Sequence, residues 1–157
     1  VREGVLTVRR GIGYLATRYD GWEDFILSLD VRVSEQGNSG VFFRARHPGF
    51  GWRPWPLGYE AQVDNHDPQN YTGSLYNRVR VTNTAAADEE WFAMRVSAVD
   101  SRIQIQINGE TVVDATDATF DRGFIALQAH DPFSRVDFRG IRVRIPAEAG
   151  SPPRPGK

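Results

Sequence analysis

Three segments of the sequence carry polar side chains at every second position, the spacing that places them on one face of a β-strand. The residues predicted to share that face are Asn38, Phe42, Arg44 and Arg46, then Glu60, Gln62 and Asp64, and finally Gln128 and His130. The alternating residues predicted to face the core are Val41, Phe43 and Ala45, then Tyr59, Ala61 and Val63, and finally Ile125, Leu127 and Ala129. If the three strands are neighbours, their polar groups form one site.

The composition of this face suits carbohydrate recognition. Planar amides, carboxylates and guanidinium groups satisfy sugar hydroxyls, and aromatic rings cover the apolar side of a pyranose. The rings could come from Trp52, Trp55, Tyr71 and Tyr76. Every antiparallel sheet with one solvated face also alternates in this way. The concentration of Gln, Asn, His and Arg beside aromatic residues favours a binding site over simple solvation.

The elements that would position these residues are β-strands, because period-two alternation dominates the sequence. A long half-buried strand follows Trp22, and Asn108-Gly109 predicts a tight hairpin between two alternating segments. Asp100-Ser101 predicts another turn just before it, which makes a three-strand meander. A change of parity near the end of the chain predicts a β-bulge at Gly140. We therefore expect an all-β fold, a jelly-roll sandwich of two antiparallel sheets.

Composition limits the possible classes of protein. The chain has 157 residues, 40% of them hydrophobic, which is enough for one core, and its 19 basic and 20 acidic residues create no strong overall field toward nucleic acid. It contains no cysteine and no apolar stretch long enough to span a membrane. We expect one domain over residues 1–145, and a Pro/Gly-rich flexible tail over 146–157 that could tether it to another domain.

Several motifs add a resemblance to this pattern. Residues 38–44 (NSGVFFR), 58–65 (GYEAQVDN), 72–76 (TGSLY) and 123–130 (GFIALQAH) are similar, in order, to motifs of the 3-keto-disaccharide hydrolase family. Together they cover almost the whole chain, although each one alone is weak. The resemblance implies a concanavalin A-like lectin/glucanase fold. It also implies cleavage of glycosides whose sugar is oxidised to a ketone at C3.

That activity requires a base for the C2 hydrogen, an acid for the leaving oxygen and a donor for the developing enolate. The resemblance makes Glu60 or His130 the candidate base and Arg44 the candidate donor. His130 could instead only bond a loop at the end of its strand. The residues expected to bind substrate are Asn38, Gln62, Asp64, Tyr76, Gln128, Trp52 and Trp55. The expected elimination is followed by hydration of the product.

Other readings stay open at this point. The same fold also serves non-catalytic carbohydrate-binding modules, and a purely structural adhesion domain is a third, less favoured possibility. Asp64, His66 and Asp67 could bind a divalent cation, but a turn before Pro68 explains them as well, so we expect no metal or other cofactor. The expected partner is a carbohydrate, and the expected location is the periplasm or the cell exterior.

Overall fold

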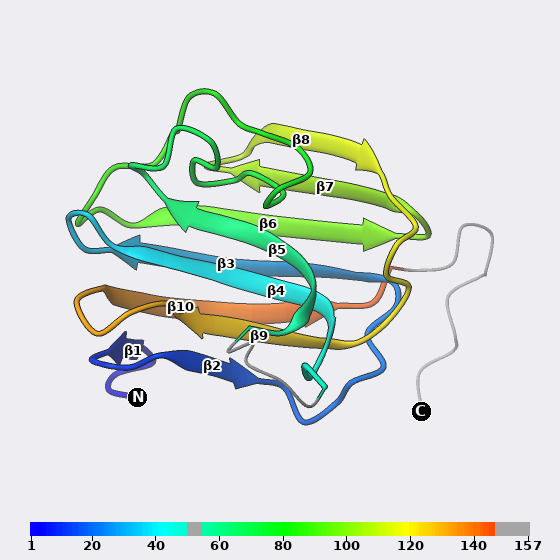
Figure 1. The fold of residues 1–157 in the computed structure, drawn as a ribbon, viewed down its shortest axis with the longest axis horizontal. Helices are drawn as coiled ribbons and strands as arrows, with labels where there is room; N and C mark the ends of the chain where they lie inside the picture. The colour runs from blue at the N-terminus through cyan, green and yellow to red at the C-terminus, as the bar shows by residue number, and fades with distance from the viewer. Residues whose placement is uncertain (50–54, 147–157) are drawn as a thin grey trace.

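The computed structural model describes residues 1–49 and 55–146, and in these the protein is an all-β sandwich of two antiparallel sheets (Figure 1). The six-stranded sheet has the order β1 (Leu6–Arg9), β10 (Arg135–Arg144), β3 (Phe25–Val33), β6 (Phe92–Val99), β7 (Arg102–Ile107) and β8 (Glu110–Thr116). The four-stranded sheet has the order β2 (Gly13–Ala16), β9 (Phe124–Ala129), β4 (Asn38–Arg46) and β5 (Leu57–Asp64). The predicted jelly-roll fold is confirmed.

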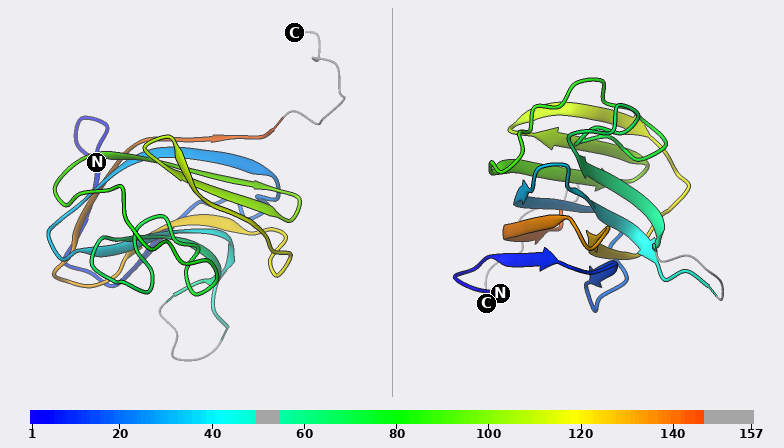
Figure 2. Two further views of the ribbon diagram at one scale, coloured as in Figure 1. Left: turned by 90° about the horizontal axis from the view of Figure 1, so that it is seen from above. Right: turned by 60° about the vertical axis from the view of Figure 1, so that its left-hand side comes forward.

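The core lies between the two curved layers seen in Figure 2. Strand β3 alternates strictly between buried and half-buried residues along its whole length, and the inward side chains of β6 and β7 continue the same layer. From the four-stranded sheet, Phe43, Tyr59 and Leu127 point into this core. The opposite surface of that sheet is therefore left for other contacts. The chain between β5 and β6 runs along the free edge of β5, and its Leu75 and Val81 enter the core.

The predicted turns are present. Asn108 and Gly109 connect β7 to β8 with φ angles of 51° and 87°, the positive values that a two-residue hairpin of this type requires. Asp100 and Ser101 connect β6 to β7 and complete the meander. At Gly140, where φ is 61°, the pairing of β10 with β3 shifts register, as the change of parity predicted.

A second bulge, in β4, was not predicted, and it corrects the assignment of two residues. Arg44 has a φ of 46°, and the pairing of β4 with both neighbours shifts register after Phe43. Beyond the bulge Ala45 packs with Phe42 on the outer face, although alternation predicted that it would face the core. Arg44 is correspondingly removed from the outer face. The extra residue moved every later side chain of β4 by one position.

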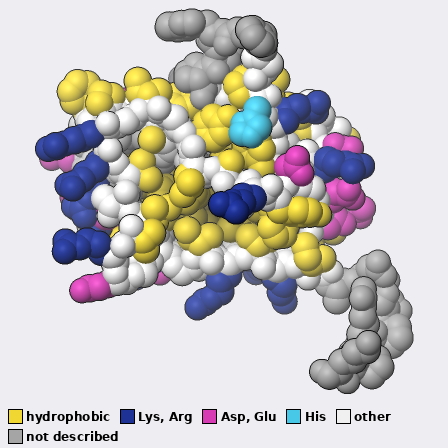
Figure 3. All heavy atoms as spheres, turned by 90° about the horizontal axis from the view of Figure 1, so that it is seen from below, with side chains coloured by type: hydrophobic (Ala, Val, Ile, Leu, Met, Phe, Trp, Pro, Cys, Tyr) yellow, Lys and Arg dark blue, Asp and Glu magenta, His cyan; other side chains and the backbone are white. Residues whose placement is uncertain are grey.

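The side of the molecule where β1 and β2 lie exposes hydrophobic residues, which gather across the view in Figure 3. Leu15 on β2 and the nearby Ile12 are 57% and 65% exposed. The described part of the chain contains no helix that could cross a membrane. The predicted tail from residue 146 falls almost wholly outside the described residues, so its flexibility stays a prediction.

Candidate functional site

The outer face of the four-stranded sheet carries a small cavity of about 90 Å³. Its lining residues are Asn38, Trp55, Glu60, Gln62, Asp67, Tyr76, Gln128 and His130. All of these except Asp67 were predicted from the sequence as site residues. The prediction that three separate segments converge on one face is confirmed, because β5, β4 and β9 are consecutive neighbours in the sheet.

Strand pairing fixes the floor of the cavity. Glu60 is opposite Phe42 and Gln62 is opposite Gly40 in the register of β4 with β5. The segment that contains Tyr76 then lies along the free edge of β5, because Tyr76 N donates to Glu60 O at 2.9 Å and Gln62 N donates to Ser74 O at 3.0 Å. These backbone bonds place the Tyr76 ring beside the Glu60 carboxyl group.

Gly40 creates the space that the Glu60 side chain occupies. A Cβ atom at position 40 would collide with Glu60 Oε1 and would also meet Glu60 Cδ at 2.7 Å. The carboxyl group therefore lies directly over the backbone of β4, not out in solvent. Only glycine leaves that space open, which gives the glycine of the NSGVFFR segment a role in the site.

Burial controls the protonation of Glu60. The residue is 9% exposed, and this loss of water raises the pKa of its carboxyl group to about 8. An acid with a pKa close to neutrality can both accept and release a proton under physiological conditions. Perturbed groups of this kind in a concave site are typical of general acid–base catalysts.

His130 lies just beyond the end of β9 and is held on two sides. Its ring stacks on Trp55 with a centroid distance of 5.4 Å and an interplanar angle of 12°. Its Nδ1 lies 3.2 Å from Asp131 Oδ2, and Ser134 Oγ donates to that same carboxylate oxygen at 2.7 Å. A proton on Nδ1 directed at Asp131 leaves Nε2 as the nitrogen for exchange with a ligand.

Gln128 and Gln62 present amide groups at the base of the cavity, and each residue is 3% exposed. Among the described residues, Gln128 Oε1 has no hydrogen-bond partner. A buried amide oxygen without a protein partner is costly, and a water molecule or a ligand that donates to it would satisfy it. A sugar hydroxyl is a donor of the required kind.

Asp64 is not part of the cavity lining, although it was predicted to bind substrate. Asp64 Oδ2 accepts from Asn38 Nδ2 at 2.9 Å, while Oδ1 accepts from the backbone N–H groups of His66 and Asp67. The carboxylate therefore anchors the turn after β5 and orients the Asn38 amide. Trp52, the other predicted ring, lies outside the described residues.

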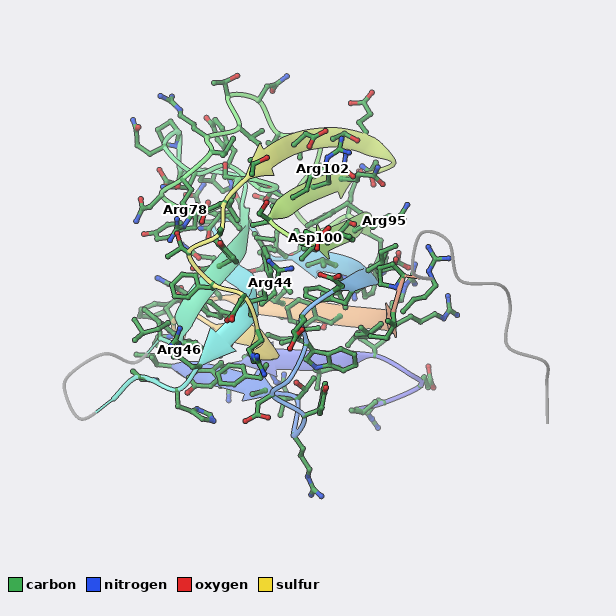
Figure 4. The ribbon with its side chains drawn as sticks, turned by 90° about the vertical axis from the view of Figure 1, so that its right-hand side faces the viewer. Arg44, Arg46, Arg78, Arg95, Asp100 and Arg102 are labelled. Carbon is green, nitrogen blue, oxygen red and sulfur yellow. The ribbon has the colours of Figure 1, made fainter. Side chains whose placement is uncertain are left out.

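Arg44 is also absent from the cavity, which corrects its predicted role as enolate donor. Its side chain is 2% exposed and turns toward one end of the sandwich, the end that faces the viewer in Figure 4. There it donates to Glu23 O at 2.9 Å, to Phe120 O at 3.3 Å and to Asp24 Oδ1 at 3.3 Å. The bulge in β4 causes this reorientation, and the guanidinium group holds two loops together.

The sequence of residues 1–144 matches the family model described as 3-keto-alpha-glucoside-1,2-lyase-like domain. The chain belongs to this family. No curated protein matches the sequence significantly. Among solved structures it is similar to two presumptive glycosyl hydrolases of Parabacteroides distasonis. One has 19% sequence identity and a TM-score of 0.80, and the match covers 94% of this chain and 82% of that chain. The other has 22% sequence identity and a TM-score of 0.75, and the match covers 91% of this chain and 87% of that chain.

It is also similar to the carbohydrate-binding module CBM66 of Bacillus subtilis, with 18% identity and a TM-score of 0.59 over 90% of this chain and 95% of that chain. At these identities the structural likeness establishes the fold, a sandwich shared by enzymes and by binding modules. The family membership supports a protein that acts on glycosides. The choice between catalysis and binding depends on the residues of the cavity.

The side chains of residues 64–67, the alternative metal site considered from the sequence, make contacts within the protein. His66 Nε2 lies 2.6 Å from Asp88 Oδ2, and His66 Nδ1 lies 3.0 Å from Gln36 Nε2. Within the described ranges, no three His, Asp or Glu residues lie close enough together to hold a metal ion. Asp67 Oδ1 instead accepts from Gln69 N at 2.8 Å. The segment forms a turn, as its Asn and Asp content favours.

The sequence interpretation missed three residues of the site. Asp67 was assigned to a turn or, less favoured, to a metal site, yet it lines the cavity. Asp131 was not considered, although a carboxylate directly after a candidate catalytic histidine could have drawn attention to it. Gly40 was treated as part of a motif, and its meaning depends on a cross-strand contact that a single sequence does not reveal.

Proposed function

We propose that this protein cleaves glycosides of 3-keto sugars by elimination across C1 and C2, with Glu60 as the general base. The observation that supports this most directly is the buried Glu60 carboxyl group, whose pKa is raised to about 8 inside a cavity lined by amides and an imidazole. A module that only binds sugars gains nothing from a carboxyl group held at such a pKa. A proton-transfer catalyst does.

The proposed reaction proceeds in balanced steps. A C3 ketone acidifies the C2 hydrogen, so the ionised Glu60 carboxylate removes that proton and an enolate forms. The enolate electrons then form the C1–C2 double bond, and the bond from C1 to the glycosidic oxygen breaks. The leaving oxygen takes a proton from His130. Water then adds across the C1–C2 double bond: its oxygen bonds to C1, His130 takes a proton from it, and Glu60 returns its proton to C2. No nucleophilic carboxylate pair is required.

The enolate oxygen requires hydrogen-bond donors that are already in place. With Arg44 directed elsewhere, the buried amides of Gln62 and Gln128 are the best-placed candidates, and the Asn38 amide is oriented beside them by Asp64. The orientation of a glutamine amide is assigned from its partners, so Gln128 can present either its oxygen or its nitrogen to a ligand. Gln62 and Gln128 take over the role first predicted for Arg44.

A non-catalytic carbohydrate-binding module is the second candidate, favoured by two observations. The cavity is small, about 90 Å³, and the fold is shared with CBM66. A module would use Trp55 and Tyr76 as stacking platforms and the amides as hydroxyl partners. It would not depend on the protonation state of Glu60.

The decisive experiment measures product release from a nitrophenyl 3-keto-glucoside and from its unoxidised parent. We expect release only from the keto compound, with at least a hundredfold loss of kcat/KM in Glu60→Gln. Arg95→Gln, an exposed change on the outer surface of the other sheet, is the matched control and should keep full activity. Absence of release together with saturable binding of a glycan would overturn the proposal in favour of the module.

A further inference from the structure

A second and larger cavity, of about 460 Å³, lies where β4 ends and β9 begins. Its charged and imidazole-bearing lining residues are Arg18, Asp20, Arg46, His47, Asp121 and Arg122. It shares no residue with the cavity that contains Glu60. Its volume is in the range typical of small-molecule sites. The proposed elimination does not use any of its residues.

One wall of this second cavity is built from aromatic rings. The His47 and Phe124 rings lie 4.7 Å apart, and Tyr14 stacks on Phe124 with a centroid distance of 5.9 Å and an interplanar angle of 14°. The half-buried Tyr14 does not line the cavity, but its Oη lies 2.7 Å from His47 Nδ1 and fixes the exposed His47 ring. A planar ring held in one orientation is a stacking surface for another planar ring.

Three guanidinium groups come to this wall from separate parts of the chain. Arg18 follows β2, Arg46 ends β4, and Arg122 precedes β9; Figure 4 shows Arg46 at this end of the sandwich. The carboxylates in the lining are Asp20 and Asp121, and Asp121 Oδ2 lies 4.0 Å from Arg122 Nε. Glu23 Oε1, outside the lining, lies 3.5 Å from Arg122 Nη1, so Arg122 is already paired. Among the described residues Arg18 and Arg46 form no salt bridge, and the planar fork of arginine matches a carboxylate.

The two cavities border a common aromatic cluster on the same face of the sheet. Trp55 lines the Glu60 cavity and packs on a cluster that contains Phe124 and Ala45, which line the second cavity. Along β9, Gln128 and Phe124 are four residues apart, which corresponds to about 13 Å of strand. A ligand that reaches both cavities must therefore extend well beyond one sugar ring.

We infer that the second cavity binds the leaving group of the substrate, and that this group is an aromatic ring bearing a carboxylate. The ring stacks on His47, and the carboxylate pairs with Arg18 and Arg46. The inference rests on the proposed function, because the Glu60 cavity must hold the 3-keto sugar. A neutral second sugar would leave the guanidinium groups of Arg18 and Arg46 without a matching anion.

A binding experiment tests the site without relying on catalysis. We would titrate the full chain with 4-hydroxybenzoate, phenol and glucose by NMR, and follow the imidazole signals of His47 and His130. The expected result is that 4-hydroxybenzoate binds at least fivefold more tightly than phenol and shifts His47 rather than His130. The double variant Arg18→Gln/Arg46→Gln should abolish that preference, whereas Arg95→Gln should retain it. Equal binding of the two arenes, or tighter binding of glucose, would overturn the inference.

A kinetic experiment separates this inference from the proposed function. The 3-keto-glucosides of 4-hydroxybenzoate and of phenol are compared as substrates. The 4-hydroxybenzoate compound should have a kcat/KM at least fivefold higher than the phenol compound. The double variant should lose this difference. If both compounds are cleaved and their rates differ only by the amount that the basicities of their leaving groups predict, the inferred carboxylate site is wrong. The elimination is still supported in that case. If neither is cleaved, the proposed function fails, and the titration still decides what the second cavity binds.

Discussion

Burial has two effects on Glu60. It makes the environment unfavourable for the charge of the carboxylate, and it gives the carboxyl group a pKa suited to proton transfer. Because only the ionised carboxylate removes the C2 proton, kcat/KM should rise with pH and reach half of its maximum near pH 8, the value to which burial raises the pKa of Glu60. A pH–rate profile with the nitrophenyl 3-keto-glucoside measures this. A profile that falls through the same pH range would instead make Glu60 the general acid.

The same raised pKa predicts a gain in stability when the charge is removed. Between its ordinary pKa of 4.5 and about 8, Glu60 ionises in the unfolded chain but not in the folded one, so ionisation favours unfolding. Glu60→Gln keeps the shape and should raise the free energy of unfolding by about 3 kcal/mol at pH 7. Urea titrations at pH 7 and pH 4 provide the check, because the gain should nearly vanish at pH 4. An equal gain at both values would rule out this electrostatic origin.

Gly40 offers a separate test of the position of Glu60. In Gly40→Ala the new methyl group should push the Glu60 carboxyl group out of its place, with at least a tenfold loss of kcat/KM and a stability loss of about 1–2 kcal/mol. Gly11→Ala is the matched control, since a Cβ there meets nothing within 4 Å. Full activity of the Gly40 variant would show that the carboxyl group can work from another position.

At the scale of elements, the bulge in β4 separates what the sequence could predict from what it could not. Alternation identified the strands from β3 onward, the Asn108-Gly109 hairpin and the face shared by Glu60 and Gln128, because these depend on local pattern, but it did not identify the short strands β1 and β2. It failed at Arg44 and Ala45. The bulge arises from a non-glycine residue with positive φ and is stabilised by loops far along the chain, and no periodicity signals such a contact.

That correction makes Arg44 a structural residue of the fold, with a measurable consequence. Arg44→Met removes donors to Glu23 O, Phe120 O and Asp24 Oδ1, so it should lower the free energy of unfolding by about 2–4 kcal/mol. The activity of the protein that remains folded should change less than twofold, because Arg44 does not line the Glu60 cavity. Thermal unfolding and active-site titration at a temperature well below the transition measure the two effects. Loss of kcat in fully folded Arg44→Met would return this residue to the mechanism.

At the scale of the whole molecule, two carboxylates, Asp131 in a loop and Asp137 between neighbouring strands, affect stability in the opposite direction to Glu60 as pH changes. Hydrogen bonds from Ser134 and neighbouring backbone N–H groups lower the pKa of Asp131, and bonds from Thr7 and Arg32 lower that of Asp137, in each case against the opposing effect of burial. Their contribution to stability is complete above the ordinary aspartate pKa and is lost as pH falls through their folded values.

The two effects together predict where this domain is most stable. Acid removes the contribution of Asp131 and Asp137, and ionisation favours unfolding through Glu60 from about pH 4.5 upward, so the melting temperature should peak at roughly pH 4 to 5. In Glu60→Gln only the loss of melting temperature at low pH remains. The peak in melting temperature should therefore broaden into a plateau that extends to neutral pH. Melting curves from pH 3 to pH 8 on both proteins test this. A wild-type curve that is flat from pH 5 to pH 8 would mean that Glu60 ionises in the folded protein as it does in water, and the proposed base would lose its physical support.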